Sequence, residues 1–78
     1  METTFFLRGN VVGYFEQRRP PSRGEFRYTP YRGQGLWSLE ESLSCGPQRC
    51  YFVMNGAKHY FTVTRIVSNG VLEISEAA

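Results

Sequence analysis

The sequence predicts a small all-β domain of five or six antiparallel strands, arranged as a barrel or rolled sheet of the SH3-like or OB-like kind. Two Asn-Gly dipeptides lie between β-branched and aromatic residues, short runs alternate apolar with polar residues, and no helical pattern exceeds a turn or two. Closure of such a sheet removes the edges that promote aggregation.

The length and composition indicate one globular domain, residues 1–78. The chain has 78 residues, of which 41% are hydrophobic and 15% aromatic, a composition too apolar for a disordered chain. A domain this small often draws stability from a disulfide, a metal or a partner subunit. We therefore expect a homo-oligomer or another protein partner.

The N-terminal third contains one strand-like stretch and one loop. Residues 4–16 are strand-like but include Gly9-Asn10 and Gly13, so they form either a hairpin turning at Gly9-Asn10 or one long strand bent at the glycines. Residues 17–24 include Pro20-Pro21, and consecutive prolines cannot donate the backbone hydrogen bonds that a β-strand needs. We expect a loop there.

The middle of the chain contains two further candidate strands. Residues 25–31 alternate in character and predict a strand that stops at Pro30, and residues 33–35 form a turn. Residues 36–39 are interpreted as a strand. The alternative is a helical turn over residues 38–43, because Ser38 followed by Glu41 matches a capping box.

The dipeptide Asn55-Gly56 predicts a two-residue type I′ hairpin, since both residues tolerate positive φ. This turn places Met54 opposite Ala57, Phe52 opposite His59 and Cys50 opposite Phe61, all on one face. The other face is more polar and carries Tyr51, Val53, Lys58, Tyr60 and Thr62.

Asn69-Gly70, treated in the same way, pairs Val67 with Leu72 and Arg65 with Ile74. Its apolar residues fall on the face shared with Phe61, so the two turns agree on one core face and predict a three-stranded meander over residues 50–75. Arg65 is the exception on this face. It either extends outward to solvent or is re-aimed by a β-bulge.

No catalytic or metal-binding constellation is present, and we expect neither an enzyme nor a cofactor. Cys45 and Cys50 flank the turn-forming residues 46–49, where reduced structural cysteines are the main expectation and a disulfide or metal chemistry the alternatives. His59, the single histidine, is expected to pack on the core face or at its rim. Metal binding would need more ligands than two Cys and one His.

A basic, aromatic segment is the first candidate binding site. The net charge is only +2, but residues 18–32 contain five Arg and one Glu, a local charge of +4. Arginine binds phosphates and exposed aromatics stack on bases, so residues 18–37 form a candidate site for an anionic ligand or single-stranded nucleic acid. The candidate residues are Arg18, Arg19, Arg23, Arg27, Tyr28, Tyr31, Arg32 and Trp37.

A second candidate site is the polar-aromatic hairpin face carrying Tyr51, Val53 and Tyr60, which suits an interface because Tyr-rich patches are common there. The preferred hypothesis is a non-enzymatic binding or assembly module, acting through homo-oligomer or partner-protein contacts. No apolar run approaches the about 18 residues of a membrane helix, and the acidic N-terminus does not resemble a signal peptide. We expect a cytoplasmic protein.

Overall fold

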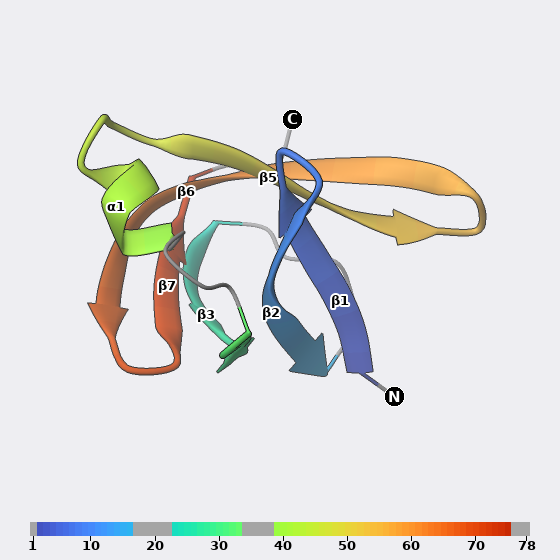
Figure 1. Ribbon diagram of the computed structural model, residues 1–78, viewed down its shortest axis with the longest axis horizontal. Helices are drawn as coiled ribbons and strands as arrows, with labels where there is room; N and C mark the ends of the chain where they lie inside the picture. The colour runs from blue at the N-terminus through green and yellow to red at the C-terminus, as the bar shows by residue number, and fades with distance from the viewer. Residues whose placement is uncertain (1, 17–22, 34–38, 76–78) are drawn as a thin grey trace.

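The computed structural model describes residues 2–16, 23–33 and 39–75 of the chain. Within them the fold is all-β apart from one short helix, as predicted (Figure 1). The elements in chain order are β1 (Glu2–Leu7), β2 (Asn10–Glu16), β3 (Gly24–Arg27), β4 (Thr29–Pro30), α1 (Leu39–Leu43), β5 (Gln48–Met54), β6 (Ala57–Ser68) and β7 (Val71–Ile74).

The strands form one curled antiparallel sheet in the order β3-β7-β6-β5-β1-β2-β4. The strands at the two ends of this order, β3 and β4, are separated in the chain by Tyr28 alone. The Tyr28 amide donates to the Gly70 carbonyl at 3.0 Å, and the Tyr31 amide donates to the Val12 carbonyl at 2.9 Å. One short stretch of chain therefore borders both edges of a barrel-like sheet.

The sheet has seven strands within the described residues, and the expectation of five or six was wrong. The strand expected over residues 25–31 is divided into β3, which pairs with β7, and β4, which pairs with β2. The chain changes from one edge of the sheet to the other at Tyr28, which interrupts the ladder at that residue.

The β5–β6 hairpin has the predicted register. Met54 pairs with Ala57, Phe52 with His59 and Cys50 with Phe61. Asn55 and Gly56 both have positive φ, 52° and 79°, as a type I′ turn requires. The hairpin is the longest in the sheet, and its turn projects beyond β1 and β2 in Figure 1.

The register predicted for the β6–β7 hairpin was wrong. Leu72 pairs with Ile66 rather than Val67, and Ile74 pairs with Val63 rather than Arg65, because β6 is irregular at both places. Gly70 has a φ of 82°, but Asn69 is not in the positive-φ region, so the turn is not type I′. The bulge between Val63 and Arg65 turns the arginine outward, which is one of the two predicted alternatives.

The N-terminal stretch is a hairpin, the first of the two alternatives left open by the sequence. It turns at Arg8-Gly9, one residue earlier than expected, and both residues have positive φ, 51° and 82°. A register shift between Phe5 and Phe6 marks a bulge in this β1–β2 pair. Phe5 points into the core, whereas the side chain of Phe6 lies on the outer face.

The segment expected to be a strand over residues 36–39 is helical where it is described. Leu39 opens α1, and its side chain is buried in the core, while residues 36–38 lie outside the described residues. The helical alternative is therefore the one that forms. The buried Gln48 side chain holds the connection from α1 to β5, since its Nε2 donates to the Ser42 and Gly46 carbonyls at 2.9 and 3.1 Å. Its Oε1 accepts from Arg8 at 3.1 Å.

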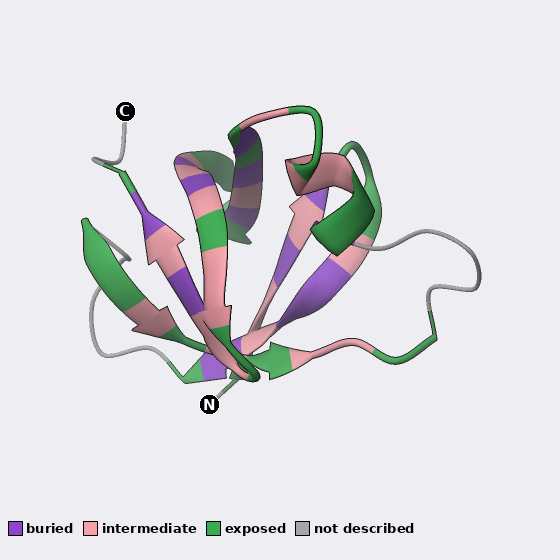
Figure 2. Ribbon diagram, turned by 90° about the vertical axis from the view of Figure 1, so that its left-hand side faces the viewer, coloured by how far each residue is buried: buried purple, intermediate pink, exposed green. Residues whose placement is uncertain are grey.

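The core is a cluster of aromatic rings within the curl of the sheet. The centroid of the Phe5 ring lies 5.9 Å from those of Phe15 and Phe26 and 5.6 Å from that of Phe61. Buried and less buried positions alternate along the strands in Figure 2, as expected for a sheet with one inward face. Among the residues that the structure describes, the buried apolar ones are Phe5, Leu7, Val12, Phe15, Leu39, Cys50, Phe52, Phe61, Val63, Leu72 and Ile74.

His59 lies at the rim of this core. Its imidazole is exposed and stacks on the buried Phe52 ring, with centroids 5.2 Å apart and an interplanar angle of 17°. The predicted pairing of His59 with Phe52 on this face is confirmed. In the described residues, no helix has the length and apolar character needed to cross a membrane.

Candidate functional site

The arginines of the first candidate site are exposed where the structure describes them. Arg23, Arg27 and Arg32 are all exposed, and Tyr31 is half-buried beside Tyr14, with ring centroids 6.2 Å apart. Three of the eight predicted residues, Arg18, Arg19 and Trp37, lie outside the described residues. The described part of this segment therefore has exposed cations on or beside β3 and β4.

Two of the aromatic residues between these arginines, Phe26 and Tyr28, pack against the core. Phe26 contacts Phe15 with centroids 5.0 Å apart, and Tyr28 meets the buried Phe5 ring edge-on at 5.7 Å. Burial raises the pKa of the Tyr28 hydroxyl above its ordinary value, because the charged phenolate loses hydration there. Both rings are therefore half-buried against the core, whereas Arg27 between them is exposed.

A surface cavity of about 390 Å³ beside Arg27 and Tyr28 also carries acidic groups. Glu2 and Glu16 line it together with Tyr14 and Thr29. Two carboxylates and one guanidinium share this space, so its charge does not favour an anion.

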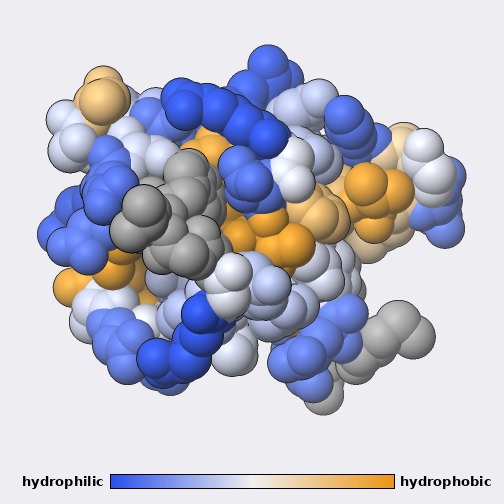
Figure 3. All heavy atoms as spheres, in the orientation of Figure 1, coloured by the Kyte–Doolittle hydropathy of each residue, from blue (hydrophilic) through white to orange (hydrophobic). Residues whose placement is uncertain are grey.

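The three residues of the second candidate site lie together on the outer face of the β5–β6 hairpin. Tyr51 pairs with Tyr60 across the two strands, with ring centroids 5.7 Å apart, and Val53 follows on the same face of β5. Val53 is 49% exposed and is the exposed large hydrophobic side chain of the described residues. Figure 3 shows hydrophobic atoms along this projecting hairpin, with hydrophilic atoms toward its tip.

The structure adds Phe6 to this face and completes a row of three rings across three strands. Phe6 of β1 pairs with Tyr51 of β5, and the two rings stack with centroids 5.3 Å apart at an interplanar angle of 22°. We call Phe6, Tyr51 and Tyr60 the aromatic row. All three are half-buried, so the row is a surface feature and not part of the core.

Two cations lie directly over rings of the aromatic row. The Arg49 guanidinium carbon is 4.0 Å from the centroid of the Tyr60 ring, and Lys58 Nζ is 4.8 Å from that of Tyr51. Both are diagonal contacts between β5 and β6, at the distance at which a cation is attracted to a ring face. These contacts hold both exposed cations above the row.

The charge of this region is entirely positive. Residues 42–72 contain no Asp or Glu, whereas they include Arg49, Lys58 and Arg65. On the outer face of the β1–β2 hairpin, Glu2 and Glu16 pair with each other at the end remote from Phe6. The four-residue offset along β1 corresponds to about 13 Å at the usual rise of a strand.

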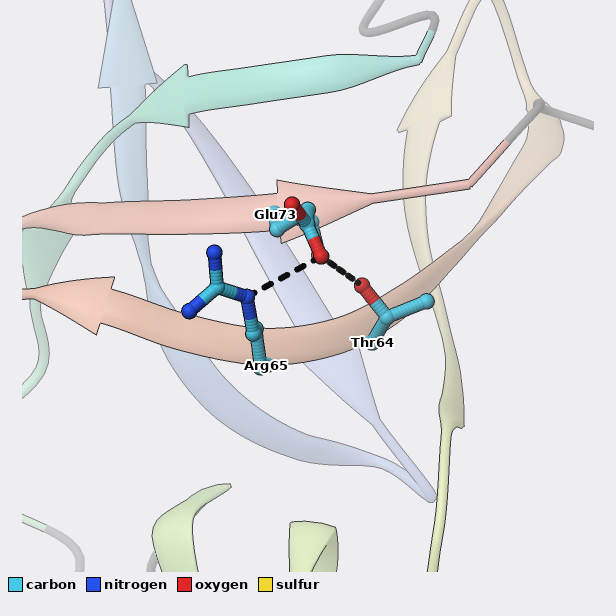
Figure 4. Close-up of polar contacts among 3 residues, drawn as sticks. All are labelled: Thr64, Arg65 and Glu73. Carbon is cyan, nitrogen blue, oxygen red and sulfur yellow. Dashed lines mark hydrogen bonds and ion pairs between the residues drawn. The ribbon is translucent and has the colours of Figure 1, made fainter.

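Arg65 is the cation of this region that has a carboxylate partner. Its Nε donates to Glu73 Oε1 at 3.1 Å, and the Thr64 hydroxyl donates to the same oxygen at 3.2 Å (Figure 4). These hydrogen bonds and the charge of Arg65 lower the pKa of the Glu73 carboxyl. The unneutralised charge therefore lies on Arg49 and Lys58, neither of which forms an ion pair within the described residues.

The sequence predicts Lys58 on this face, but the predicted site residues do not include Lys58, Phe6 or Arg49. The acid-free run from residue 42 to 72 is visible in the sequence and points to the cations. Phe6 had no such signal, because its position beside Tyr51 depends on pairing between strands more than forty residues apart.

The two cysteines are free thiols in different surroundings. Cys45 is exposed at the turn after α1, whereas Cys50 is fully buried in β5. Burial raises the pKa of the Cys50 thiol to about 12. Among the described residues, no group of three or more His, Cys, Asp or Glu lies together as a metal site would require.

Iodoacetamide is expected to modify only Cys45 in the native protein, because the thiolate is the nucleophile and Cys50 is both buried and protonated. Intact mass spectrometry should show one adduct before unfolding and two after it, and Cys45→Ser should show none before unfolding. Rapid native alkylation of Cys50 would contradict this, as would a wild-type protein that forms adducts only after reduction.

No known protein family matches the sequence, and no curated protein or solved structure shows a significant match to the chain. Its function is therefore inferred from geometry and chemistry.

Proposed function

We propose that this protein is a non-enzymatic binding module that contacts another macromolecule through the outer face of β1, β5 and β6. The observation that carries the proposal is the aromatic row, which continues into the exposed Val53 and is flanked by Arg49 and Lys58. The barrel-like sheet, whether of the SH3-like or the OB-like kind, is the scaffold that presents this face.

The composition of the face supports contact with a protein surface. Tyr and Arg are enriched among residues that dominate binding energy, since they combine large apolar area with polar groups. The core does not use these side chains, because Phe52 and Phe61 fill it from the opposite side of the same strands. The outer rings are thus available for a partner without loss of the fold.

Photo-crosslinking from the face tests this proposal. With p-benzoylphenylalanine at Val53, irradiation in the source cells should give a discrete product heavier than the 9.0 kDa chain. The same group at Asn69, exposed on the β6–β7 turn, is the control and should give little product. Equal yields from the two positions, or none from Val53, would contradict a binding role for this face.

A further inference from the structure

We infer that the partner of this face is an acidic protein segment that also carries an apolar side chain. The inference rests on the proposed function, because it names the chemistry of the partner that the aromatic row, Arg49, Lys58 and Val53 recognise. The charge, the ring contacts and the exposed area of the face distinguish three classes of partner: an acidic segment, a second copy of this chain and a single-stranded nucleic acid.

Charge complementarity requires an anionic partner. Arg49 and Lys58 are exposed, unpaired with carboxylates in the described residues, and located in a run of 31 residues without Asp or Glu. Contact with the rings limits the positions of both cations, so less side-chain entropy is lost when an anion binds. Carboxylates of a partner would find these cations already in place.

A second copy of the chain does not supply that charge. In a two-fold symmetric interface the same face meets itself, so two copies would bring together two Arg49 and two Lys58 side chains. Glu2 and Glu16, the carboxylates on the outer face of the β1–β2 hairpin, lie at the end of that hairpin remote from Phe6. Four desolvated cations without partners oppose such a dimer.

The ring contacts disfavour a single-stranded nucleic acid. Base stacking requires a free ring face. Tyr51 lies between the stacked Phe6 ring and Lys58, because β5 is the middle strand, and Arg49 covers Tyr60. A base that stacks on Tyr51, or on the face of Tyr60 beneath Arg49, would have to displace one of these contacts, whereas carboxylates bind the cations without disturbing the rings.

Val53 explains why the partner carries an apolar side chain. It is 49% exposed, pairs with Lys58 and follows Tyr51 on the same face, so an apolar surface lies directly beside a cation. An acidic segment without an apolar residue would leave Val53 in water. Burial of its side chain by a partner adds the hydrophobic contribution that charge pairing at an exposed site lacks.

A displayed library of random peptides, selected on the full chain, tests this inference. The selection should enrich Asp or Glu on both sides of an aliphatic or aromatic residue. The enriched peptide, labelled with fluorescein, is then titrated by anisotropy at low and at high salt, and its affinity should fall with salt because the contacts are exposed ion pairs. Enrichment of neutral or basic peptides would overturn the inference.

Two variants with the same loss of charge separate site-specific binding from general attraction. Arg49→Gln with Lys58→Gln should weaken binding of the selected peptide by about tenfold, the combined effect of two surface ion pairs. Arg23→Gln with Arg27→Gln removes two exposed cations elsewhere and should leave the affinity within about twofold. Equal losses from the two double variants would overturn the inference.

Two further experiments test the nucleic acid and the second copy of the chain as partners. An oligothymidylate of about 15 nucleotides that binds wild type but not Tyr51→Leu would identify a nucleic-acid site and overturn the inference. A dimer in sedimentation equilibrium that Val53→Glu dissociates would overturn it too, yet would leave the proposed binding role of the face intact. Failure of crosslinking from Val53, in contrast, removes the proposed function itself.

Discussion

Replacing Phe5 by alanine is expected to lower the free energy of unfolding by about 3–5 kcal/mol, the usual cost of deleting a buried phenylalanine ring. Phe5 is completely buried and touches four other rings, those of Phe15, Phe26, Tyr28 and Phe61. These rings come from three strands, β2, β3 and β6, and from the residue that joins β3 to β4, so separate parts of the sheet border the cavity and it has little means of collapsing.

The loss is large relative to the stability of so small a domain. A chain of 78 residues typically has an unfolding free energy of roughly 4–12 kcal/mol. Urea denaturation followed by tryptophan fluorescence or circular dichroism should show Phe5→Ala with a much lower midpoint, or already unfolded in water. An unchanged midpoint would contradict the central place of Phe5 in the core.

Phe6→Ala is the matched control, because it makes the same change one residue further along β1 on the outer face. The Phe6 ring is half-buried, so its removal should cost about 1–2 kcal/mol. The chain should remain folded but lose the stacking partner of Tyr51, and with it part of its affinity for the partner. Similar destabilisation by both variants would show that Phe6 belongs to the core.

Gly13→Ala is expected to cost about 1–3 kcal/mol and to act locally, by separating β4 from β2. Gly13 pairs with Phe5 on one side and with Pro30 on the other. A Cβ at this position would overlap the Thr29 carbonyl oxygen and approach Tyr28 Cδ2 to 2.9 Å. The Thr29 oxygen is a backbone atom, so the β4 strand itself has to move.

Amide hydrogen exchange distinguishes this local opening from general destabilisation. In Gly13→Ala, the Tyr31 amide, which donates to the Val12 carbonyl, should lose more protection than the Phe61 amide in the β5–β6 hairpin. Gly9→Ala is the control, since its φ of 82° is strained for alanine but no atom lies within 4 Å of the added Cβ. If Gly9→Ala exposes the Tyr31 amide equally, steric separation of β4 is contradicted.

Local chemistry made the β5–β6 hairpin predictable. Asn55-Gly56 specifies a turn with two positive φ angles, and a two-residue turn fixes the pairing of every residue that follows. The same reasoning failed at Asn69-Gly70, where the dipeptide is identical but β6 contains two irregularities. A bulge adds a residue to one strand, and each addition reverses the faces beyond it.

The candidate site residues also differ in whether local sequence or the tertiary structure decides their grouping. Tyr51, Val53 and Tyr60 share a face because of the period of the strand, so their grouping followed from the sequence. The predicted grouping of Arg27 with Tyr28 as ligand-binding neighbours depended on which side of the sheet was covered. The structure turns Tyr28 toward the core and leaves Arg27 exposed, an outcome that β3 in isolation does not specify.

The sequence by itself determined the all-β class, the β5–β6 register and the outer face on which Tyr51 and Tyr60 lie, because turn geometry and side-chain alternation act over a few residues. Only the tertiary structure decided that Tyr28 joins two edges of the sheet, that β6 is bulged, and that Phe6 completes the aromatic row. These features depend on how distant strands pack around the phenylalanine core, and no local pattern carries that information.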